Sequence, residues 1–168
     1  MSAILVMIVL PVLLALSAGW DLASYTIPNH LSLALLVGFL AFCVSAGLPL
    51  AVLGSHLAAF AVALAVGFAL FAARCIGGGD AKLFAATALW LGFGDLLSYA
   101  LVAALFGGAL TLLLLFARRM PLPEGLSQRA WIVRLHSAGS GIPYGVALAA
   151  GALYVLPTTQ IFRMAMNA

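Results

Sequence analysis

Charged side chains are scarce in this sequence. Only 7% of its 168 residues are charged, seven Lys or Arg and four Asp or Glu, while 66% are hydrophobic. Soluble domains carry about 25% charged residues, so this chain has too few polar side chains to cover a globule in water. A soluble enzyme and a disordered tail are therefore excluded, and we predict an integral membrane protein.

Cysteine and metal-ligand clusters are scarce as well. The two cysteines, Cys43 and Cys75, form no CxxC pair and have no histidine nearby, as a zinc site would require. We therefore expect no metal, no cofactor and no disulfide. His56 lies in an apolar stretch, where we expect a satisfied interior side chain. The net charge of +3 is small, and in a membrane protein it reports orientation rather than nucleic-acid binding.

The apolar stretches predict an all-α polytopic membrane protein, a compact bundle of about six transmembrane helices in one domain over residues 1–168. The expected spans are Ser2–Trp20, Leu31–Gly47, Ala51–Ala73, Lys82–Gly92, Asp95–Ala117 and Tyr144–Leu156, followed by a short tail, Pro157–Ala168. The first span lacks the basic start of a secretory signal, so we expect it to be retained. The fourth rises only about 21 Å from Asp80 to Phe93, and we expect it to be short or partly re-entrant.

Basic residues indicate the orientation. If all six segments cross, the loops after the first, third and fifth spans share one side, which collects Arg74, Lys82, Arg118, Arg119, Arg129 and Arg134. The other side has only Arg163. This bias predicts cytoplasmic loops on the basic side and an N-terminus outside. Residues 118–140 form the cytoplasmic basic loop; within it, Leu126–His136 is either a basic interfacial helix or a solvated linker. Either form favours anionic lipid headgroups.

Two of the four acidic residues fall on the predicted cytoplasmic face. Asp21 follows Trp20 at a helix C-terminus, where the helix dipole disfavours a negative charge. Asp80 closes Gly77-Gly78-Gly79-Asp80 and opens an apolar helix. The structural alternative for Asp21 is a polar residue that ends a span, and the structural alternative for Asp80 is a helix cap. Ionisable groups at membrane depth are expensive, however, and default to functional hypotheses.

The remaining ionisable candidates have simpler interpretations. We expect Asp95 to cap the fifth span and Glu124 to occupy a solvated turn. Lys82 either extends towards headgroups or tunes Asp80 electrostatically, although residues two apart do not share a helix face.

Two carboxyls on one face suggest an acid–base pair. Close carboxylates share a proton because both cannot ionise cheaply. One then removes a proton from water while the other protonates a carbonyl or leaving group. Three consecutive glycines beside Asp80 leave room for an extended peptide, so the pattern predicts metal-independent peptide hydrolysis.

Three stretches resemble the type IV prepilin peptidase family, above all its short form serving tight-adherence (Flp) pili. They are Asp21-Leu-Ala-Ser-Tyr-Thr-Ile-Pro-Asn29, Gly77-Gly-Gly-Asp-Ala-Lys-Leu83 and Ile142-Pro-Tyr-Gly-Val146. The resemblance implies that Asp21 and Asp80 are the catalytic pair of an aspartic-type endopeptidase in the bacterial inner membrane. It also implies the substrate, a pilin precursor whose basic leader is removed at the cytoplasmic face, just before its hydrophobic helix.

The sequence departs from the family in two ways. Ala23, Ser24 and Tyr25 occupy an interval where family members often carry basic residues. The chain also lacks the cytoplasmic insertion with paired cysteines that larger members link to N-methylation, so methyltransferase activity is not expected.

The smaller motifs keep two interpretations, structural support and substrate contact. Pro28 forces extended geometry on Ile27, and we expect Asn29 to cap the second span. Pro143 suits the first turn of the last helix and Tyr144 offers a hydroxyl near the cytoplasmic boundary. We include these four residues with Gly77, Gly78, Gly79 and Lys82 as candidate substrate-binding residues.

Two other function classes remain open from the residues alone. A small proton- or cation-coupled transporter could use the Asp pair as its ion site, since broken helices with glycines line such sites. A non-catalytic membrane subunit of a pilus or secretion machine is the second alternative.

Overall fold

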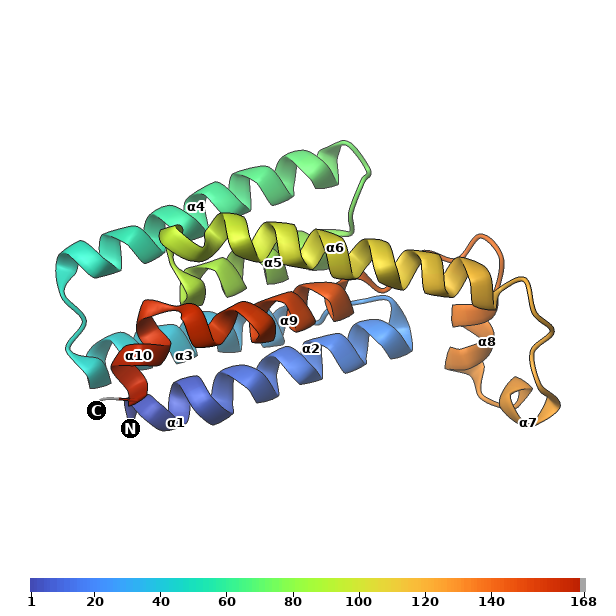
Figure 1. Cartoon of the computed structure of the whole chain (residues 1–168), viewed down its shortest axis with the longest axis horizontal. Helices are drawn as coiled ribbons and strands as arrows, with labels where there is room; N and C mark the ends of the chain where they lie inside the picture. Colours follow the sequence, from blue (N-terminus) through green and yellow to red (C-terminus); the bar gives the residue numbers. More distant parts are fainter. Residues whose placement is uncertain (167–168) are drawn as a thin grey trace.

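The computed structural model describes residues 1–166, and the regular structure in that part of the chain is helical (Figure 1). The α-helices are α1 (Ser2–Ile4), α2 (Leu10–Ser24), α3 (Asn29–Ala46), α4 (Leu50–Ala72), α5 (Gly78–Leu91), α6 (Phe93–Ala117), α7 (Glu124–Ser127), α8 (Ala130–His136), α9 (Tyr144–Val155) and α10 (Gln160–Met166). A π-helical segment, η1 (Leu5–Val9), and a 3-10 segment, η2 (Leu156–Thr158), complete the set. The last two residues of the expected tail lie outside the described residues.

Four helical stretches are long and apolar enough to cross a membrane. They are Ser2–Ser24, Asn29–Ala46, Leu50–Ala72 and Phe93–Ala117. The first joins α1, η1 and α2 into one rod, whose π turn precedes Pro11; proline has no N–H to donate to the helical ladder. This rod continues past the expected end at Trp20, so Asp21 lies inside its last turn.

α5 is the short fourth helix that the sequence predicts. Its 14 residues rise about 21 Å, less than the roughly 30 Å hydrocarbon core. Nine of these residues are buried, and α5 packs against α3, α4, α6 and α9, so it forms the centre of the bundle. It runs antiparallel to α4, and α6 begins at the far end (Figure 1). The chain therefore does not turn back as a re-entrant loop would.

Polar side chains on α4 and α5 fix the far end of α5. Nδ1 of His56 on α4 lies 2.8 Å from the carbonyl oxygen of Leu89, and Nε1 of Trp90 donates to the carbonyl of Leu35 on α3 at 2.9 Å. Both rings are buried. The interior histidine predicted at position 56 is confirmed, and hydrogen bonding offsets the cost of burying these polar atoms.

Small residues allow close helix packing at two places in the bundle, as is common in membrane proteins. A Cβ added to Gly67 of α4 would lie 3.2 Å from Cα of Ala81 on α5. A Cβ added to Gly151 of α9 would lie 3.0 Å from Cα of Ala103 on α6. The first contact brings α4 close to α5, and the second brings α9 close to α6.

The C-terminal part is bent. The helix that starts at Tyr144 ends in η2 at Thr158, and α10 follows at an angle of 59°. Counting this bent pair as one span raises the number of candidate spans from four to five, and α5 is the sixth bundle helix. The expected tail from Pro157 is therefore helical over most of its length. The predicted Asp95 cap is wrong, because α6 begins at Phe93 and Asp95 accepts a 3.3 Å hydrogen bond from Thr158 instead.

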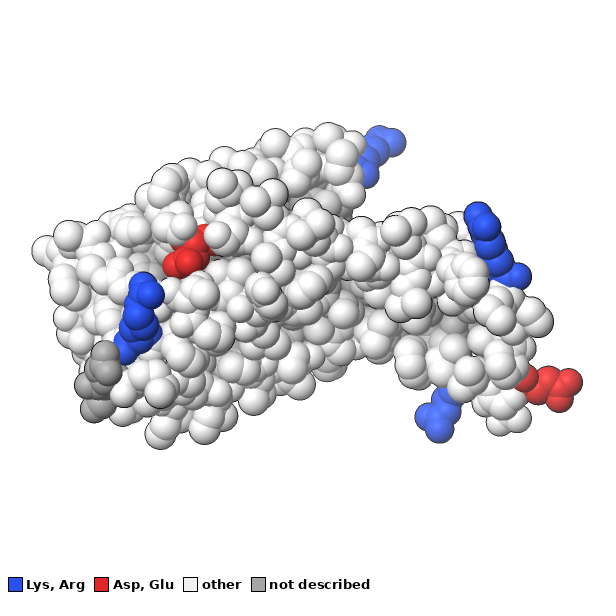
Figure 2. Space-filling model, in the orientation of Figure 1, with Lys and Arg blue, Asp and Glu red and all other residues white. Residues whose placement is uncertain are grey.

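One end of the bundle gathers the loops that carry the sequence motifs. The end of α2 and the beginnings of α5 and α9 meet there, and α7 and α8 extend beyond it (Figure 1). Figure 2 shows most of the visible Lys and Arg at this same end, with an almost uncharged middle. We refer to it as the motif end.

Candidate active site

Asp21 projects from the last turn of α2 into the motif end. It is only 4% exposed, and its Oδ2 accepts a 2.7 Å hydrogen bond from the backbone N–H of Gly145, the second residue of α9. A helix C-terminus disfavours a carboxylate, whereas a helix N-terminus attracts one. The first turn of α9 therefore compensates for the unfavourable position of Asp21 on α2.

Asp80 occupies the first turn of α5. Its Oδ2 accepts a 3.1 Å hydrogen bond from the backbone N–H of Gly77, so one oxygen does perform the helix-capping role. Its Oδ1 is buried and has no hydrogen-bond partner among the described residues. Burial raises the pKa of the Asp80 carboxyl above its ordinary value, and the Gly77 hydrogen bond opposes this shift. Capping and a functional role are compatible here because they use different oxygens.

Ile27 lies between α5, which carries Asp80, and α9, whose Gly145 binds Asp21. A Cβ on Gly79 of α5 would lie 3.1 Å from Cβ of Ile27, and a Cβ on Gly145 of α9 would lie 2.9 Å from its Cδ1. Both helices can approach this side chain only because glycine has no Cβ. The segment that follows α2 thus packs, through Ile27, between the first turns of α5 and α9.

The two acids line one cavity at the motif end, of about 320 Å³. Its lining residues are Asp21, Tyr25, Thr26, Ile27, Gly77, Gly78, Gly79 and Asp80. Backbone of Gly77–Gly79 forms one wall, and these three glycines place no side chain in the cavity. The cavity therefore combines two carboxyls with a wall that leaves room for a peptide.

A model of the type IV leader peptidase family matches residues 8–112, more than half of the chain, and this match includes Asp21 and Asp80. The chain belongs to this family. Membership identifies a membrane peptidase, a hydrolase whose family acts on prepilins. Comparison with curated proteins and with solved structures gives no match.

Not all of the predicted substrate-binding residues of this leader peptidase line the acid cavity. Gly77, Gly78 and Gly79 do. Lys82 instead donates a 3.0 Å hydrogen bond to Oδ1 of Asn29, which ties α5 to the start of α3. These two residues border a separate hollow of about 250 Å³ between α3, α4 and α5.

The predicted cap by Asn29 is wrong. Pro28 takes the N-cap position of α3, with φ −62° and ψ 138°, and no side chain caps the helix. The Asn29 side chain is already committed to Lys82. Ile27, directly before Pro28, is buried in the bundle.

Pro143 and Tyr144 position α9 from outside the acid cavity. Pro143 is buried directly before α9, where its fixed φ suits a helix start. The ring of Tyr144 lies against Gly107 of α6 and fills the space that a Cβ would need. Both residues thus hold the helix whose first turn donates to Asp21.

Four residues of this site were not among the predicted site residues: Tyr25, Thr26, Ile27 and Gly145. Tyr25 ends α2 in the left-handed region, with φ 56°, and its N–H donates to the carbonyl of Asp21 at 2.7 Å. Its hydroxyl is buried without a partner among the described residues. The signals were present, because Tyr25 stands where family members often have a basic residue and Gly145 belongs to the third motif.

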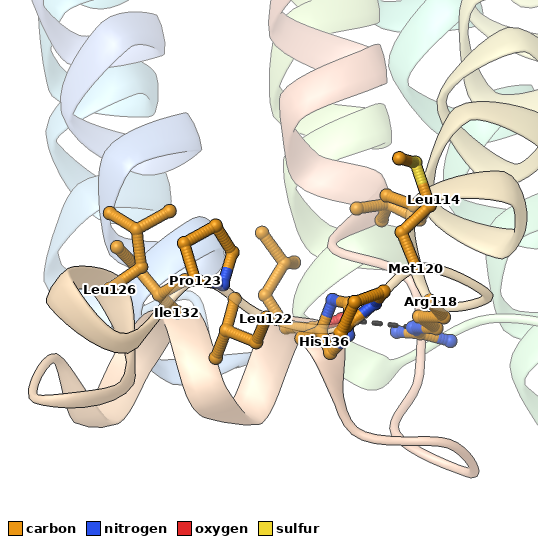
Figure 3. A pocket seen from close by; sticks show the side chains of 11 residues that line it. Leu114, Arg118, Met120, Leu122, Pro123, Leu126, Ile132 and His136 are labelled. Atoms are coloured by element: carbon orange, nitrogen blue, oxygen red, sulfur yellow. Dashed lines mark hydrogen bonds between the residues drawn. The ribbon is translucent and has the colours of Figure 1, made fainter.

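Arg118 fastens the basic loop to the start of α9. Its guanidinium donates hydrogen bonds of 2.7–3.1 Å to the carbonyls of Leu135, Ser140 and Gly141 and to Oγ of Ser140. Figure 3 shows Arg118 at the edge of an apolar cavity of about 360 Å³ beneath α7 and α8. This cavity holds neither Asp21 nor Asp80. The predicted Leu126–His136 segment is helical over Ala130–His136.

Proposed function

We propose that this chain is a prepilin leader peptidase in which Asp21 and Asp80 act as an aspartic-type catalytic pair. The observation that carries the proposal is that both carboxyls line one cavity of about 320 Å³, beside the backbone of Gly77–Gly79. The family match supports the reaction class. The pair, its mechanism and the substrate are our own inference.

In the proposed reaction, one carboxyl is ionised and the other protonated, because two close carboxylates share a proton. The ionised carboxylate removes a proton from water, whose oxygen attacks the scissile carbonyl carbon. The protonated carboxyl donates its proton to the carbonyl oxygen. The C–N bond then breaks, and the leaving nitrogen takes a proton from the pair to become the new amino terminus.

Backbone hydrogen bonds preorganise this arrangement. Gly145 holds Oδ2 of Asp21 and Gly77 holds Oδ2 of Asp80. Oδ1 of Asp80 is buried without a hydrogen-bond partner among the described residues, so the proposed reaction requires water and substrate to reach it. Fixed donors cost no reorganisation during the reaction. No metal or cofactor is needed for this chemistry.

We propose that cleavage occurs at the cytoplasmic face of the bacterial inner membrane, with the N-terminus outside. The excess of basic residues in the loops at the motif end supports this orientation. The proposed substrate is a pilin precursor of the tight-adherence (Flp) type, with a basic leader followed by a hydrophobic helix.

Residues 1–168 act as one peptidase domain, and the basic 118–140 region contacts anionic headgroups. Exposed Trp131 and Val133 on α8 favour the interfacial helix over a solvated linker.

The decisive experiment replaces each acid by its amide. Asp21→Asn and Asp80→Asn each keep the shape of the side chain but remove the titrating group, so each should lower cleavage of a co-expressed pilin precursor about 10²–10⁴-fold, the usual share of acid–base catalysis. The mass of the pilin recovered with each variant measures cleavage.

The matched control is Asp95→Asn, which alters an acid at the opposite end of the bundle and should cleave normally. Membrane insertion of all three variants is checked by fractionation. Full cleavage by both Asp21→Asn and Asp80→Asn contradicts the proposal. Ion flux in proteoliposomes without any proteolysis would favour the transporter alternative, and tolerance of Asp80→Ala would favour a non-catalytic subunit.

A further inference from the structure

A lateral groove runs between α4 and α6 over the surface of α5. It consists of two adjoining hollows of about 200 and 180 Å³, which share Val66, Phe84 and Ala100. The first hollow reaches Phe93 at the start of α6, and the second reaches Ile76 and Tyr144 at the motif end. We call this continuous feature the α4–α6 groove.

Each wall of the groove is one stripe of a helix. The α6 wall is Leu96, Leu97, Ala100, Ala103 and Ala104, and the α4 wall is Val62, Ala63, Val66 and Leu70. Both sets have the i, i+4, i+8 spacing of a single helix face. Each stripe is about 12 Å long at 1.5 Å per residue. Alanines on both walls allow close approach of another helix, as small residues do in membranes.

The groove lies next to the part of the structure that holds the acids. Phe84 is stacked on the buried Tyr99, with ring centroids 5.3 Å apart, and it lies one helical turn after Asp80, on the same face of α5. At the motif end, Ile76 precedes Gly77 of the acid cavity, and Tyr144 precedes Gly145, which binds Asp21. The groove and the acid cavity share no lining residue, but one end of the groove is thus formed by chain neighbours of the residues that surround the two carboxyls.

We propose that the α4–α6 groove receives the apolar transmembrane helix of the substrate, so that the chain leaving its end enters the cavity between Asp21 and Asp80. This inference rests on the proposed function. The apolar walls match a hydrophobic helix, and the position of the groove next to the acid cavity distinguishes it from a surface that only lipid covers. The hollow between α3 and α4 is less suited, because the Asn29–Lys82 hydrogen bond borders it and Lys82 does not share a face of α5 with Asp80.

The first test fills the groove and compares two substrates. Ala100→Trp places a large ring between the walls, whereas Leu101→Trp alters a neighbouring residue that is 57% exposed and lines neither hollow. With a full precursor, Ala100→Trp should raise KM at least tenfold, and Leu101→Trp should resemble the unaltered protein. With a short peptide that spans the cleavage site but lacks the apolar helix, both should cleave alike. Equal KM values for the full precursor would overturn the inference.

Because Ala100→Trp could disturb folding, the second test is cross-linking, which adds no bulky side chain to the groove. Single cysteines replace Val66 or Ala104 in a background in which Cys43 and Cys75 are Ser and Asp80 is Asn, so that an uncleaved precursor with a cysteine in its apolar helix stays bound. Disulfide cross-links should form at both positions. They should not form at Leu64→Cys in the hollow between α3 and α4, or at Leu105→Cys, which is 71% exposed.

Cross-links at Leu64→Cys alone, equal cross-links at all four positions, or none at Val66→Cys and Ala104→Cys would each overturn the inference and leave the groove to lipid. These outcomes are independent of the catalytic pair. If the groove inference fails but the proposed function holds, Asp21→Asn and Asp80→Asn still abolish cleavage of both substrates. If the proposed function fails, neither amide variant loses cleavage.

Discussion

The backbone N–H of Gly145 donates a 2.7 Å hydrogen bond to Oδ2 of Asp21, although 124 residues separate the two in the sequence. This contact joins the last turn of α2 to the first turn of α9. Gly145 lies outside the family-matched residues 8–112, so the C-terminal part of the chain completes the site that the matched part begins.

Gly145→Ala should reduce leader cleavage by at least about tenfold, because small displacements of a catalytic group are costly. The added Cβ would lie 2.9 Å from both Oδ2 of Asp21 and Cδ1 of Ile27. Initial cleavage rates of the purified variants measure the effect. Gly108→Ala is the control, since nothing lies within 4 Å of its added Cβ. Normal cleavage by Gly145→Ala would show that Asp21 needs no such close support.

Gly78 and Gly79, two of the three glycines before Asp80, should differ in their tolerance of substitution. Gly79→Ala places a Cβ 3.1 Å from Cβ of Ile27, whereas the Cβ of Gly78→Ala lies 3.4 Å from the ring of Phe71, an ordinary contact. Gly79→Ala should therefore lower the cleavage rate about tenfold or more by displacing the first turn of α5. Gly78→Ala should stay within a few-fold of the unaltered protein. The opposite ranking in a cleavage assay would contradict the packing around Ile27.

Arg118 should affect leader cleavage indirectly, by holding the loop of residues 118–140 in place. Arg118→Ala removes the hydrogen bonds to Ser140 and Gly141, and Arg118→Lys cannot reproduce the planar fork. Limited proteolysis of residues 118–140 should accelerate in both variants, and leader cleavage should fall several-fold because α9 loses its anchor. The neighbouring exposed Arg119 provides the control, since Arg119→Ala alters the same local charge. Identical proteolysis of Arg118→Ala and Arg119→Ala would rule out this role.

The cleavage rate should fall at both low and high pH. At low pH both carboxyls are protonated and no base remains; at high pH both are ionised and no acid remains. Burial raises the pKa of Asp80, so its protonated form persists to higher pH and the basic limb should lie above the ordinary aspartate value of about 3.9. Initial rates in a series of buffers measure the profile. Asp95→Asn should reproduce it, and a rate already falling as pH rises through about 4 would contradict the shared proton.

Much of the fold follows from local sequence. Scarce charge and long apolar runs predicted the membrane bundle, and the short run after Asp80 predicted the short helix α5. The Asn29 cap was predicted wrongly because Pro28 takes the N-cap position and the Asn29 side chain instead accepts a hydrogen bond from Lys82 of α5, a partner that local sequence does not reveal. Similarly, Tyr144 carries a hydroxyl that suggested substrate contact, while its ring packs on Gly107 in another helix.

By itself, the sequence determined that this chain lies in a membrane, that it belongs among leader peptidases, and that Asp21 and Asp80 are the acids to consider. Only the tertiary structure decided that they share one cavity, that Gly145 holds one of them, and that a lateral groove lies next to that cavity. The reason is physical. Helix formation and membrane insertion depend on residues close in the chain, whereas a cavity depends on how α2, α5 and α9 pack, and that packing is set by the missing Cβ atoms of Gly79 and Gly145 around Ile27.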